Sequence, residues 1–361
     1  MLNVTVIGGS GYTGGEVLRI LSSHPGARVV HVVSRTHAGK PVGEVFPNLR
    51  QCCEAVFCEP DPSRYLPDTD VVFCCAPHGT AMGIAREIVG KAKLIDLGPD
   101  FRFRDPAVFE EWYGKPHEAP ELAQEAVYGL VELHASEIKS AGIVGNPGCY
   151  PTCSVLALAP LLAYGLIDPE SVVIDAKSGV SGAGRSPGLA YHFPEVNDSI
   201  RPYGIPGHRH TPEIEQELSR LAGRQVKCSF SPHLVPMTRG ILVTCYARLL
   251  GWPEVGSDRA GAAGSRDIRD TGDIIALYRE YYEFRPFVRV LGPGELPHTK
   301  AVYGSNFCDV TARVDPRTGR VIAMAAIDNL VKGAAGQAVQ NMNVMFGLDE
   351  RTGLYAPGLY P

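Results

Sequence analysis

The chain has 361 residues, of which 45% are hydrophobic, and its formal net charge at pH 7 is -5. This length exceeds what one ordinary hydrophobic core needs, so we expect two domains. The composition is that of a globular protein rather than a disordered or fibrous one. A basic surplus that could neutralise phosphates is missing, so we expect no nucleic-acid partner.

Before Gly145 the sequence alternates between short apolar runs and helical patterns. Continuous apolar runs bounded by turn residues indicate strands that are covered on both faces. We expect strands at 4–7, 28–34, 70–76 and 93–97, with helices at 15–23 and 80–89. Alternating strands and helices predict a Rossmann-type, doubly wound parallel sheet.

After Gly145 the strands become longer and fewer helices separate them. We expect a helix at 152–163, strands at 171–177, 226–232, 241–249, 306–314 and 321–327, and a last helix at 332–346. This pattern predicts a second, α+β domain with a mixed sheet, and the last helix can return to the first domain. Residues 252–272 lack apolar periodicity, so we interpret them as an exposed loop.

The cysteines favour a reducing compartment. The ten of them include the adjacent pairs Cys52–Cys53 and Cys74–Cys75, and none have the C-x-x-C spacing of zinc or redox sites. The N-terminus lacks the pattern of a secretory leader, and the longest apolar stretch is too short to span a bilayer. We therefore expect a cytoplasmic protein without a metal site or a membrane partner.

A glycine-rich turn follows the first expected strand and opens the first helix. Backbone N–H groups at such a helix N-terminus can approach a pyrophosphate closely, although the G-x-x-G-x-x-G spacing alone also fits an ordinary tight turn. Its place at the first strand–helix junction favours the nucleotide interpretation. The candidate residues are Gly8, Ser10, Gly11, Tyr12, Thr13 and Gly14.

The end of the second expected strand favours NADP over NAD. NAD-binding folds usually place an acidic residue about 20 residues past the glycines, where it holds the ribose 2′-hydroxyl. Here the sequence reads Ser34-Arg35-Thr36. Two hydroxyls and a guanidinium suit a 2′-phosphate. The alternative is a polar loop with a solvated arginine.

Cys149 is the candidate nucleophile. It follows the rigid turn Asn146-Pro147-Gly148 and precedes a helix. A thiol at a helix N-terminus has a lowered pKa, and N–H groups of the turn can stabilise an oxyanion. A buried structural cysteine is the alternative, and Cys153 fits that description better.

Two histidines precede another expected helix, which Thr211 would cap with Pro212 in its first turn. His208 and His210 are both candidates for the acid/base group, and Glu213 is a candidate to orient it. The residues themselves do not choose between the two histidines.

A second glycine-rich loop runs from Lys177 to Arg185 and either closes over a ligand or serves as a flexible connection. Arg102 follows an expected strand end, where ligands of such folds collect, so it either holds an anion or forms a salt bridge.

These motifs together resemble those of the N-acetyl-gamma-glutamyl-phosphate reductases, third-step enzymes of arginine biosynthesis, over essentially the whole chain. The shared motifs are Gly-Ser-Gly-Tyr-Thr-Gly, Asp-Phe-Arg, Pro-Gly-Cys-Tyr-Pro-Thr, Ser-Gly-Ala-Gly-Arg, Gly-His-Arg-His-Thr-Pro-Glu-Ile and Asp-Asn-Leu-Val-Lys-Gly. The resemblance implies an NADP-binding domain of residues 1–148 and 328–361, and a catalytic and dimerisation domain of residues 149–327. It implies a semialdehyde dehydrogenase-like fold and a homo-oligomer, either a dimer or a tetramer.

The resemblance also implies a reaction. The Cys149 thiolate displaces phosphate from a small acyl phosphate, and the resulting thioester is reduced with NADPH to the aldehyde. Related aspartate-semialdehyde dehydrogenases place the base before a small hydroxyl residue, which favours His210, with His208 positioning the substrate. Further implied residues are Ser178, Gly179 and Asn329 for the cofactor, and Arg102, Arg185 and Asn146 for the substrate.

Three alternatives to this reaction remain. A cousin in lysine biosynthesis acts on a carrier-bound substrate, but it typically has Asn-Ala-Thr where this chain has Tyr150-Pro151-Thr152. An NADP-sensing regulator would have no need for an activated thiol. An alcohol dehydrogenase would leave Cys149 without a role.

Overall fold

The structure is a computed structural model, and it describes residues 1–252 and 268–360. The chain forms two compact units. Unit 1 comprises Met1–Gly148, Ala183–Ser186 and Leu330–Ala356, and unit 2 comprises Cys149–Gly182, Pro187–Asn329 and Pro357–Pro361. The short piece Ala183–Ser186 thus packs with unit 1, although its neighbours in sequence pack with unit 2.

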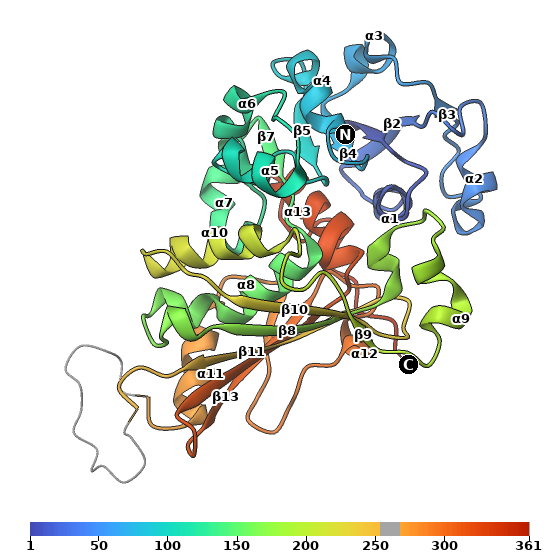
Figure 1. The fold of residues 1–361 in the computed structure, drawn as a ribbon. Coiled ribbons are helices and arrows are strands. Elements are labelled where there is room, and N and C mark those ends of the chain that lie inside the picture. Colours follow the sequence, from blue (N-terminus) through green and yellow to red (C-terminus); the bar gives the residue numbers. More distant parts are fainter. Residues whose placement is uncertain (253–267, 361) are drawn as a thin grey trace. The chain divides into compact units, whose positions relative to one another are not determined.

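Unit 1 contains a seven-stranded parallel sheet in its described part, with the order β3-β2-β1-β4-β5-β7-β6. Figure 1 labels β2, β3, β4, β5 and β7 of this sheet. The order reverses beside β1, so the carboxyl ends of β1 and β4 form a switch point where ligands of such sheets bind. The predicted doubly wound sheet is confirmed. Its strands are β1 (Leu2–Ile7), β2 (Ala27–Val33), β3 (Phe57–Cys58), β4 (Val71–Cys74), β5 (Lys93–Asp96), β6 (Val127–Tyr128) and β7 (Ile143–Gly145).

The helices of unit 1 connect successive strands, and the last helix comes from the C-terminal part of the chain. The longer ones are α1 (Tyr12–Leu21), α4 (Thr80–Ile88), α5 (Pro106–Tyr113), α6 (Pro120–Glu125), α7 (Val131–Ser140) and α13 (Gly336–Met345). Helix α13 packs against α7 and α1, so the C-terminal segment returns to the first sheet as expected. Two short helices are α2 (Val42–Val45) and α3 (Pro62–Tyr65).

Unit 2 contains a mixed sheet with the order β12-β13-β14-β11-β8-β10-β9. Buried and partly exposed residues alternate along β11, so one face packs against helices and the other stays open. The predicted mixed sheet is confirmed. Its strands are β8 (Val173–Ser178), β9 (Arg201–Pro202), β10 (Ser229–Leu234), β11 (Ile241–Arg248), β12 (Val288–Val290), β13 (Cys308–Asp315) and β14 (Arg320–Ile327).

Two helices of unit 2 begin at residues where the sequence suggested a turn or a loop. Helix α8 begins at Cys149 rather than at residue 152, because prolines are tolerated in the first turn of a helix. Helix α11 begins at Thr271, within the expected loop 252–272, of which residues 253–267 lie outside the described residues. The helices are α8 (Cys149–Ala163), α9 (Phe193–Val196), α10 (Thr211–Ala222), α11 (Thr271–Tyr281) and α12 (Thr299–Val302).

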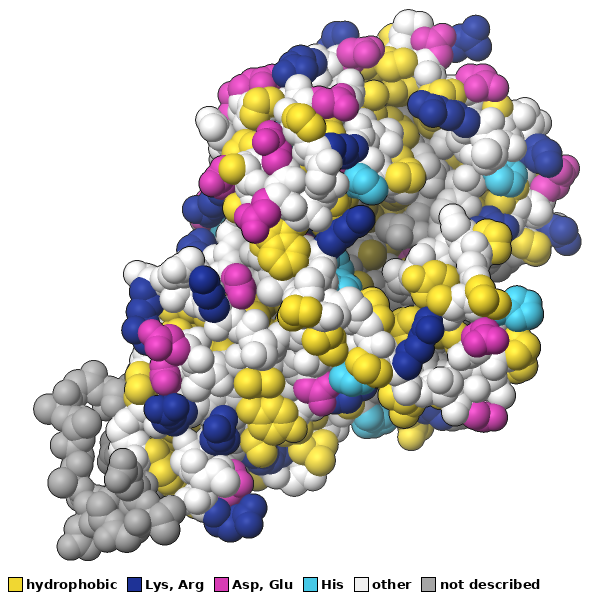
Figure 2. Space-filling view, viewed as in Figure 1, with side chains coloured by type: hydrophobic (Ala, Val, Ile, Leu, Met, Phe, Trp, Pro, Cys, Tyr) yellow, Lys and Arg dark blue, Asp and Glu magenta, His cyan; other side chains and the backbone are white. Residues whose placement is uncertain are grey.

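Figure 2 shows basic and acidic side chains intermingled on the face that it presents. Among the described residues, no helix is both long enough and apolar enough to cross a membrane. The same residues contain no group of three or more His, Cys, Asp or Glu side chains that could hold a metal ion.

A buried ion pair fixes the C-terminal segment within unit 1. The ammonium of Lys332 lies 2.6 Å from the Glu132 carboxylate, and both side chains are almost fully buried. Lys332 also donates to Gln340 Oε1 at 2.8 Å, and Gln340 donates to Glu132 at 3.1 Å. Burial alone raises the pKa of Glu132, but the Lys332 charge and hydrogen bond outweigh burial and lower it. Lys332 lies in the π-helical segment Val331–Ala335, directly before α13.

Removing one partner of this pair should destabilise the protein strongly. Lys332→Met leaves the Glu132 carboxylate buried without its cation, which typically costs about 3–5 kcal/mol. The double variant Lys332→Met/Glu132→Gln removes both charges and should recover most of that loss. Urea unfolding measures both free energies, and a single variant as stable as the unaltered protein contradicts the assignment.

Candidate active site

The glycine turn of unit 1 allows close main-chain approach. Gly8 follows β1 with φ +75°, and a Cβ there would lie 2.7 Å from the main chain of Cys75. A Cβ at Gly14 would lie 2.7 Å from the carbonyl oxygen of Gly8. Helix α1 begins just after Gly11, and no described side chain caps its first N–H groups. These donors can therefore bind an anion.

Hydroxyl groups gather beside this turn at the end of β2. The Oγ atoms of Ser10 and Ser34 are 3.0 Å apart, and Ser34 Oγ lies 3.4 Å from Thr36 Oγ1. Thr36 also forms a 2.8 Å hydrogen bond with Nδ1 of His37. The predicted nucleotide residues of both segments thus come together.

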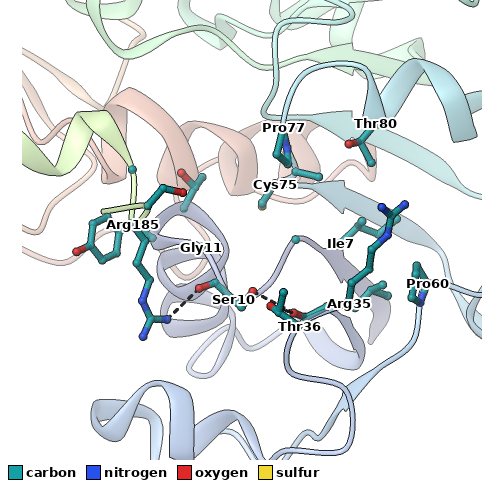
Figure 3. A pocket seen from close by; sticks show the side chains of 18 of the residues that line it. Ile7, Ser10, Gly11, Arg35, Thr36, Pro60, Cys75, Pro77, Thr80 and Arg185 are labelled. Carbon is teal, nitrogen blue, oxygen red and sulfur yellow. Dashed lines mark hydrogen bonds between the residues drawn. The ribbon is translucent and has the colours of Figure 1, made fainter. Parts of the chain in front are cut away.

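Both segments line a pocket of about 1000 Å³ within unit 1. Figure 3 shows Ser10 and Thr36 in the middle of its wall, with Arg35 on one side and Arg185 on the other. The predicted residues that line the pocket are Gly8, Ser10, Gly11, Tyr12, Thr13, Ser34, Arg35, Thr36 and Arg185. Gly14 is the exception, since it is buried in α1.

Arg185 is therefore placed differently from our expectation. The resemblance suggested that it binds substrate, whereas the structure places it against the glycine turn of the nucleotide pocket. The sequence gives no direct sign of this placement, because residue 185 is distant from the turn along the chain.

The Asp100-Phe101-Arg102 motif supports the segment that leads to Cys149. The carboxylate of Asp100 accepts hydrogen bonds from the N–H groups of Gly79 and Met82 at the start of α4. Phe101 is buried, and a Cβ at Gly145 would overlap its carbonyl group. The motif thus lies inside unit 1.

Arg102 and Asn146 are also held in the interior. Arg102 Nε donates to the carbonyl oxygen of Asn146 at 2.8 Å, and Nη2 donates to that of Leu97 at 2.9 Å. The amide of Asn146 donates to the Ala334 carbonyl at 3.1 Å, and its oxygen accepts from Asn341 at 3.0 Å. Direct substrate binding by the Asn146 side chain, as the resemblance suggested, does not fit these contacts.

In unit 2, Cys149 is the first residue of α8 and is partly exposed. Every residue of α8 from Tyr150 to Leu162 is buried, so tertiary packing fixes the position of its N-terminus. Cys153 is fully buried, and its thiol donates to the Ala325 carbonyl at 3.4 Å. Burial raises the pKa of Cys153 well above its ordinary value, so this thiol stays neutral. Of the two cysteines, Cys149 is therefore the one whose side chain is partly accessible.

Both histidines pack against the ring of Tyr150, the residue that follows Cys149. The ring centroid of Tyr150 lies 5.7 Å from that of His208 and 6.0 Å from that of His210. The two imidazole centroids are 5.0 Å apart. The structure thus brings the three predicted catalytic segments together in unit 2, with Phe230 packed against Tyr150 from β10.

His208 is neutral and its tautomer is defined. Burial lowers its pKa to about 4, and the positive charge of Arg209 adds to this effect. The backbone N–H of His210 donates to Nδ1 of His208 at 3.1 Å. Nδ1 must therefore be unprotonated, and the imidazole proton resides on Nε2. His208 consequently holds the backbone of His210.

Helix α10 begins at Thr211 with His210 as its N-cap residue, one position earlier than the sequence suggested. Glu213 lies in the first turn and is fully buried. A carboxylate there is favoured by the positive end of the helix dipole.

Two tyrosines form a hydrogen-bonded chain that sequence reasoning missed. Tyr203 donates to the hydroxyl of Tyr150 at 3.1 Å, and Tyr150 donates to the His233 carbonyl at 3.2 Å. Burial raises the pKa of both phenols, and a negative charge on Cys149 raises each further. Both tyrosines therefore remain protonated at neutral pH. The position of Tyr150 next to the cysteine was a usable signal, but Tyr203 had none.

Asn329 connects two loops of unit 2. Its Oδ1 accepts from the N–H of Gly240 at 2.7 Å, and its Nδ2 donates to Ser181 Oγ at 2.9 Å. Ser178 donates to the Gly179 carbonyl at 3.0 Å, and a Cβ at Gly179 would collide with the main chain of Thr238. The predicted cofactor residues Ser178, Gly179 and Asn329 thus belong to one rigid loop assembly.

Comparisons with known proteins also match the chain in two parts. Residues 3–141 match the family model of the semialdehyde dehydrogenase NAD binding domain, and residues 149–329 match that of the semialdehyde dehydrogenase dimerisation domain. Among solved structures, aspartate semialdehyde dehydrogenase II from Vibrio cholerae has a TM-score of 0.69 at 15% identity, covering 96% of this chain and 98% of that chain. The Candida albicans enzyme, solved with NADP, has a TM-score of 0.69 at 17% identity, with the same coverage of 96% and 98%. These two likenesses concern the fold alone.

Curated relatives are much closer in sequence. The N-acetyl-gamma-glutamyl-phosphate reductase of Desulforudis audaxviator is 52% identical over 362 residues and covers 100% of both chains. That of Pelotomaculum thermopropionicum is 51% identical over 361 residues, covering 100% of this chain and 99% of the other. With such identity over its full length, the chain belongs to the N-acetyl-gamma-glutamyl-phosphate reductase family.

Proposed function

We propose that the protein reduces N-acetyl-gamma-glutamyl phosphate to N-acetylglutamate semialdehyde and phosphate, with NADPH as the reductant. The observation that carries this proposal is the placement of Cys149 at the N-terminus of buried α8, beside the ring of Tyr150 that both histidines contact. The names of the relatives identify the acyl phosphate.

Cys149 acts as the nucleophile. The positive end of the α8 dipole favours a thiolate, which attacks the acyl carbonyl and expels inorganic phosphate. N–H groups of the first turn of α8 stabilise the oxyanion of this step. The thioester then holds the carbonyl carbon in a fixed position, and bound NADPH supplies a hydride to it. Collapse of the hemithioacetal releases the aldehyde and returns the thiolate.

His210 manages the protons of these steps. The neutral His208 holds the backbone of His210 through Nδ1. Glu213, one turn into α10, is our candidate for orienting His210. The protonated Tyr150 and Tyr203 do not compete as bases.

The pocket of unit 1 fits a dinucleotide phosphate. The main-chain crowding around Gly8 leaves no room for a side chain, and the hydroxyls of Ser10, Ser34 and Thr36 are grouped beside Arg35. We propose that Ser34, Arg35 and Thr36 bind the 2′-phosphate of NADP. We propose that Asn329 serves the nicotinamide end by holding the loops of Ser181 and Gly240. Arg102, in turn, acts by holding the segment before Cys149 rather than by binding substrate.

We further propose that the open face of the mixed sheet binds a second copy of the chain. Tyr246 and Ile322 lie directly opposite each other on β11 and β14, and Val173 lies on the other side of Tyr246 on β8. All three are at least partly exposed. A dimer of this kind is consistent with the name of the family model that covers residues 149–329. The ten cysteines are all free, which supports a cytoplasmic location.

Substitution of the nucleophile tests the reaction. Cys149→Ser should reduce phosphate-dependent NADP⁺ reduction by N-acetylglutamate semialdehyde by roughly a thousandfold or more, because serine is not ionised at this position. NADPH binding should persist, and Cys52→Ser, which alters an exposed thiol of unit 1, should retain full activity.

Turnover that survives in Cys149→Ser rules out the thioester route. No turnover with the unaltered protein directs attention to the carrier-bound substrate of lysine biosynthesis. NADPH binding without turnover on either substrate, together with a Cys149 thiol that does not react with iodoacetamide, supports a sensor.

The pH profile distinguishes the two histidines. Because the pKa of His208 is lowered to about 4, His208 stays neutral in the usual assay range. His208→Asn, whose Oδ1 can replace Nδ1 as acceptor, should keep the acid limb of the kcat/KM profile. His210→Asn should lose that limb, and its rate should fall by about 100- to 10,000-fold. The opposite pattern exchanges the two roles.

Sedimentation tests the dimer face. Ile322→Asp places a carboxylate in the apolar row of Val173, Tyr246 and Ile322, so it should lower the mass in solution to that of a smaller assembly. Thr318→Asp, at the exposed hairpin turn, is the matched control and should leave the mass unchanged. An unchanged mass for Ile322→Asp shows that subunits meet elsewhere.

A further inference from the structure

Arg185 occupies a position that the proposed reaction does not explain. The chain belongs to unit 2 up to Gly182 and again from Pro187, but Ala183–Ser186 packs with unit 1. Gly184 has φ +87°, which a glycine adopts without strain. The segment Ala183–Ser186 therefore places Arg185 at the nucleotide pocket, although this segment is far along the sequence from residues 1–148.

The guanidinium of Arg185 lies against the glycine turn. Its Nη1 donates to the carbonyl oxygen of Ser10 at 3.0 Å, and Nη2 lies 3.5 Å from that of Val45. Its central carbon lies 5.1 Å from the ring centroid of Phe46. Phe46 in turn lies beside Gly15 of α1, where a Cβ would approach its ring within 2.7 Å. Arg185 is thus held next to the start of α1.

The charges around the pocket favour an anion. Among the described residues that line it, Arg35 and Arg185 are the charged ones, and none is acidic. Arg185 donates its hydrogen bonds to uncharged carbonyl oxygens. A guanidinium has five N–H donors in all. Bonds from a guanidinium to a phosphate are roughly twice as strong as bonds between neutral groups, so a phosphate would compete well for these donors.

The two arginines flank different parts of the pocket wall. Arg35 follows β2, where the adenosine ribose is held in folds of this kind, whereas Arg185 contacts Ser10 at the entrance to α1 (Figure 3). The N-terminus of α1 is where a pyrophosphate is expected. We propose that Arg185 binds the pyrophosphate of the dinucleotide, and so links cofactor occupancy to the position of the Ala183–Ser186 loop. This inference rests on the proposed use of NADPH.

Fluorescence titration of the full-length protein with NADPH and NADH tests the assignment. Arg185→Ala should weaken binding of both dinucleotides by the same factor, roughly tenfold to a hundredfold, because both contain the pyrophosphate. Arg185→Lys should recover part of the loss, since lysine keeps the charge but not the fork. Arg35→Ala should weaken NADPH binding alone.

Arg50→Ala is the matched control. Arg50 is also exposed and donates to a main-chain carbonyl, that of Gly43 at 3.1 Å, but it does not line the pocket. Its substitution should leave both affinities unchanged. Unaltered affinities in Arg185→Ala overturn the proposal, and a loss confined to NADPH overturns it in favour of the 2′-phosphate.

Limited trypsin digestion gives a second readout that does not depend on turnover. Saturating NADPH should slow cleavage after Arg185 several-fold in the unaltered protein, while cleavage after Arg50 should not change. Cleavage after Arg185 at the same rate with and without NADPH contradicts the link between loop and cofactor. If the unaltered protein binds neither dinucleotide, the proposed function fails as well; if it binds NADPH and Arg185→Ala binds equally well, only the role of Arg185 fails.

Discussion

The position of Cys149 at the first turn of α8 is the constraint on which the candidate active site depends. From Tyr150 to Leu162 this helix is buried, and it packs on strands β11, β13 and β14 of the mixed sheet. Its N-terminus therefore cannot shift without disturbing the core of unit 2. A nucleophile that must be aligned with two histidines and an acyl carbonyl benefits from such a fixed origin.

The side chains around Cys149 have protonation states that burial sets. Burial keeps Tyr150 and Tyr203 protonated and His208 neutral, so none of these side chains is charged at neutral pH. On the other side of the chain junction, Arg102 holds the carbonyl of Asn146 inside unit 1. The segment before α8 is thus held by Arg102 in unit 1, and α8 itself is held by its burial in unit 2.

In the pocket of unit 1, small residues and charged residues make different contributions. Glycine at position 8 removes the side chain that would block the main chain, and the hydroxyls at the end of β2 define a polar wall. The cations come from different segments, with Arg35 next to β2 and Arg185 from the distant loop Ala183–Ser186.

The sequence alone predicted the two sheets and the glycine turn, and it made Cys149 the candidate nucleophile, because each has a strong local signal. Apolar runs of strand length marked β1, β4 and β5, and the turn before Cys149 distinguished it from buried Cys153. Local signals also failed in identifiable ways. The helix was expected to begin at residue 152 and begins at Cys149, since the first turn tolerates proline, and the capping Asp270 before α11 was overlooked within a polar segment.

Only the tertiary structure decided which distant groups meet. The amide group of Asn146 contacts Asn341 and the Ala334 carbonyl, and Arg185 donates to the carbonyl of Ser10, although these partners are far away along the chain. The neutral state of His208 likewise follows from burial and the nearby Arg209 charge, not from its local sequence pattern. Hydrogen bonding and desolvation depend on neighbours in space, and periodicity along a chain does not indicate which residues those neighbours are.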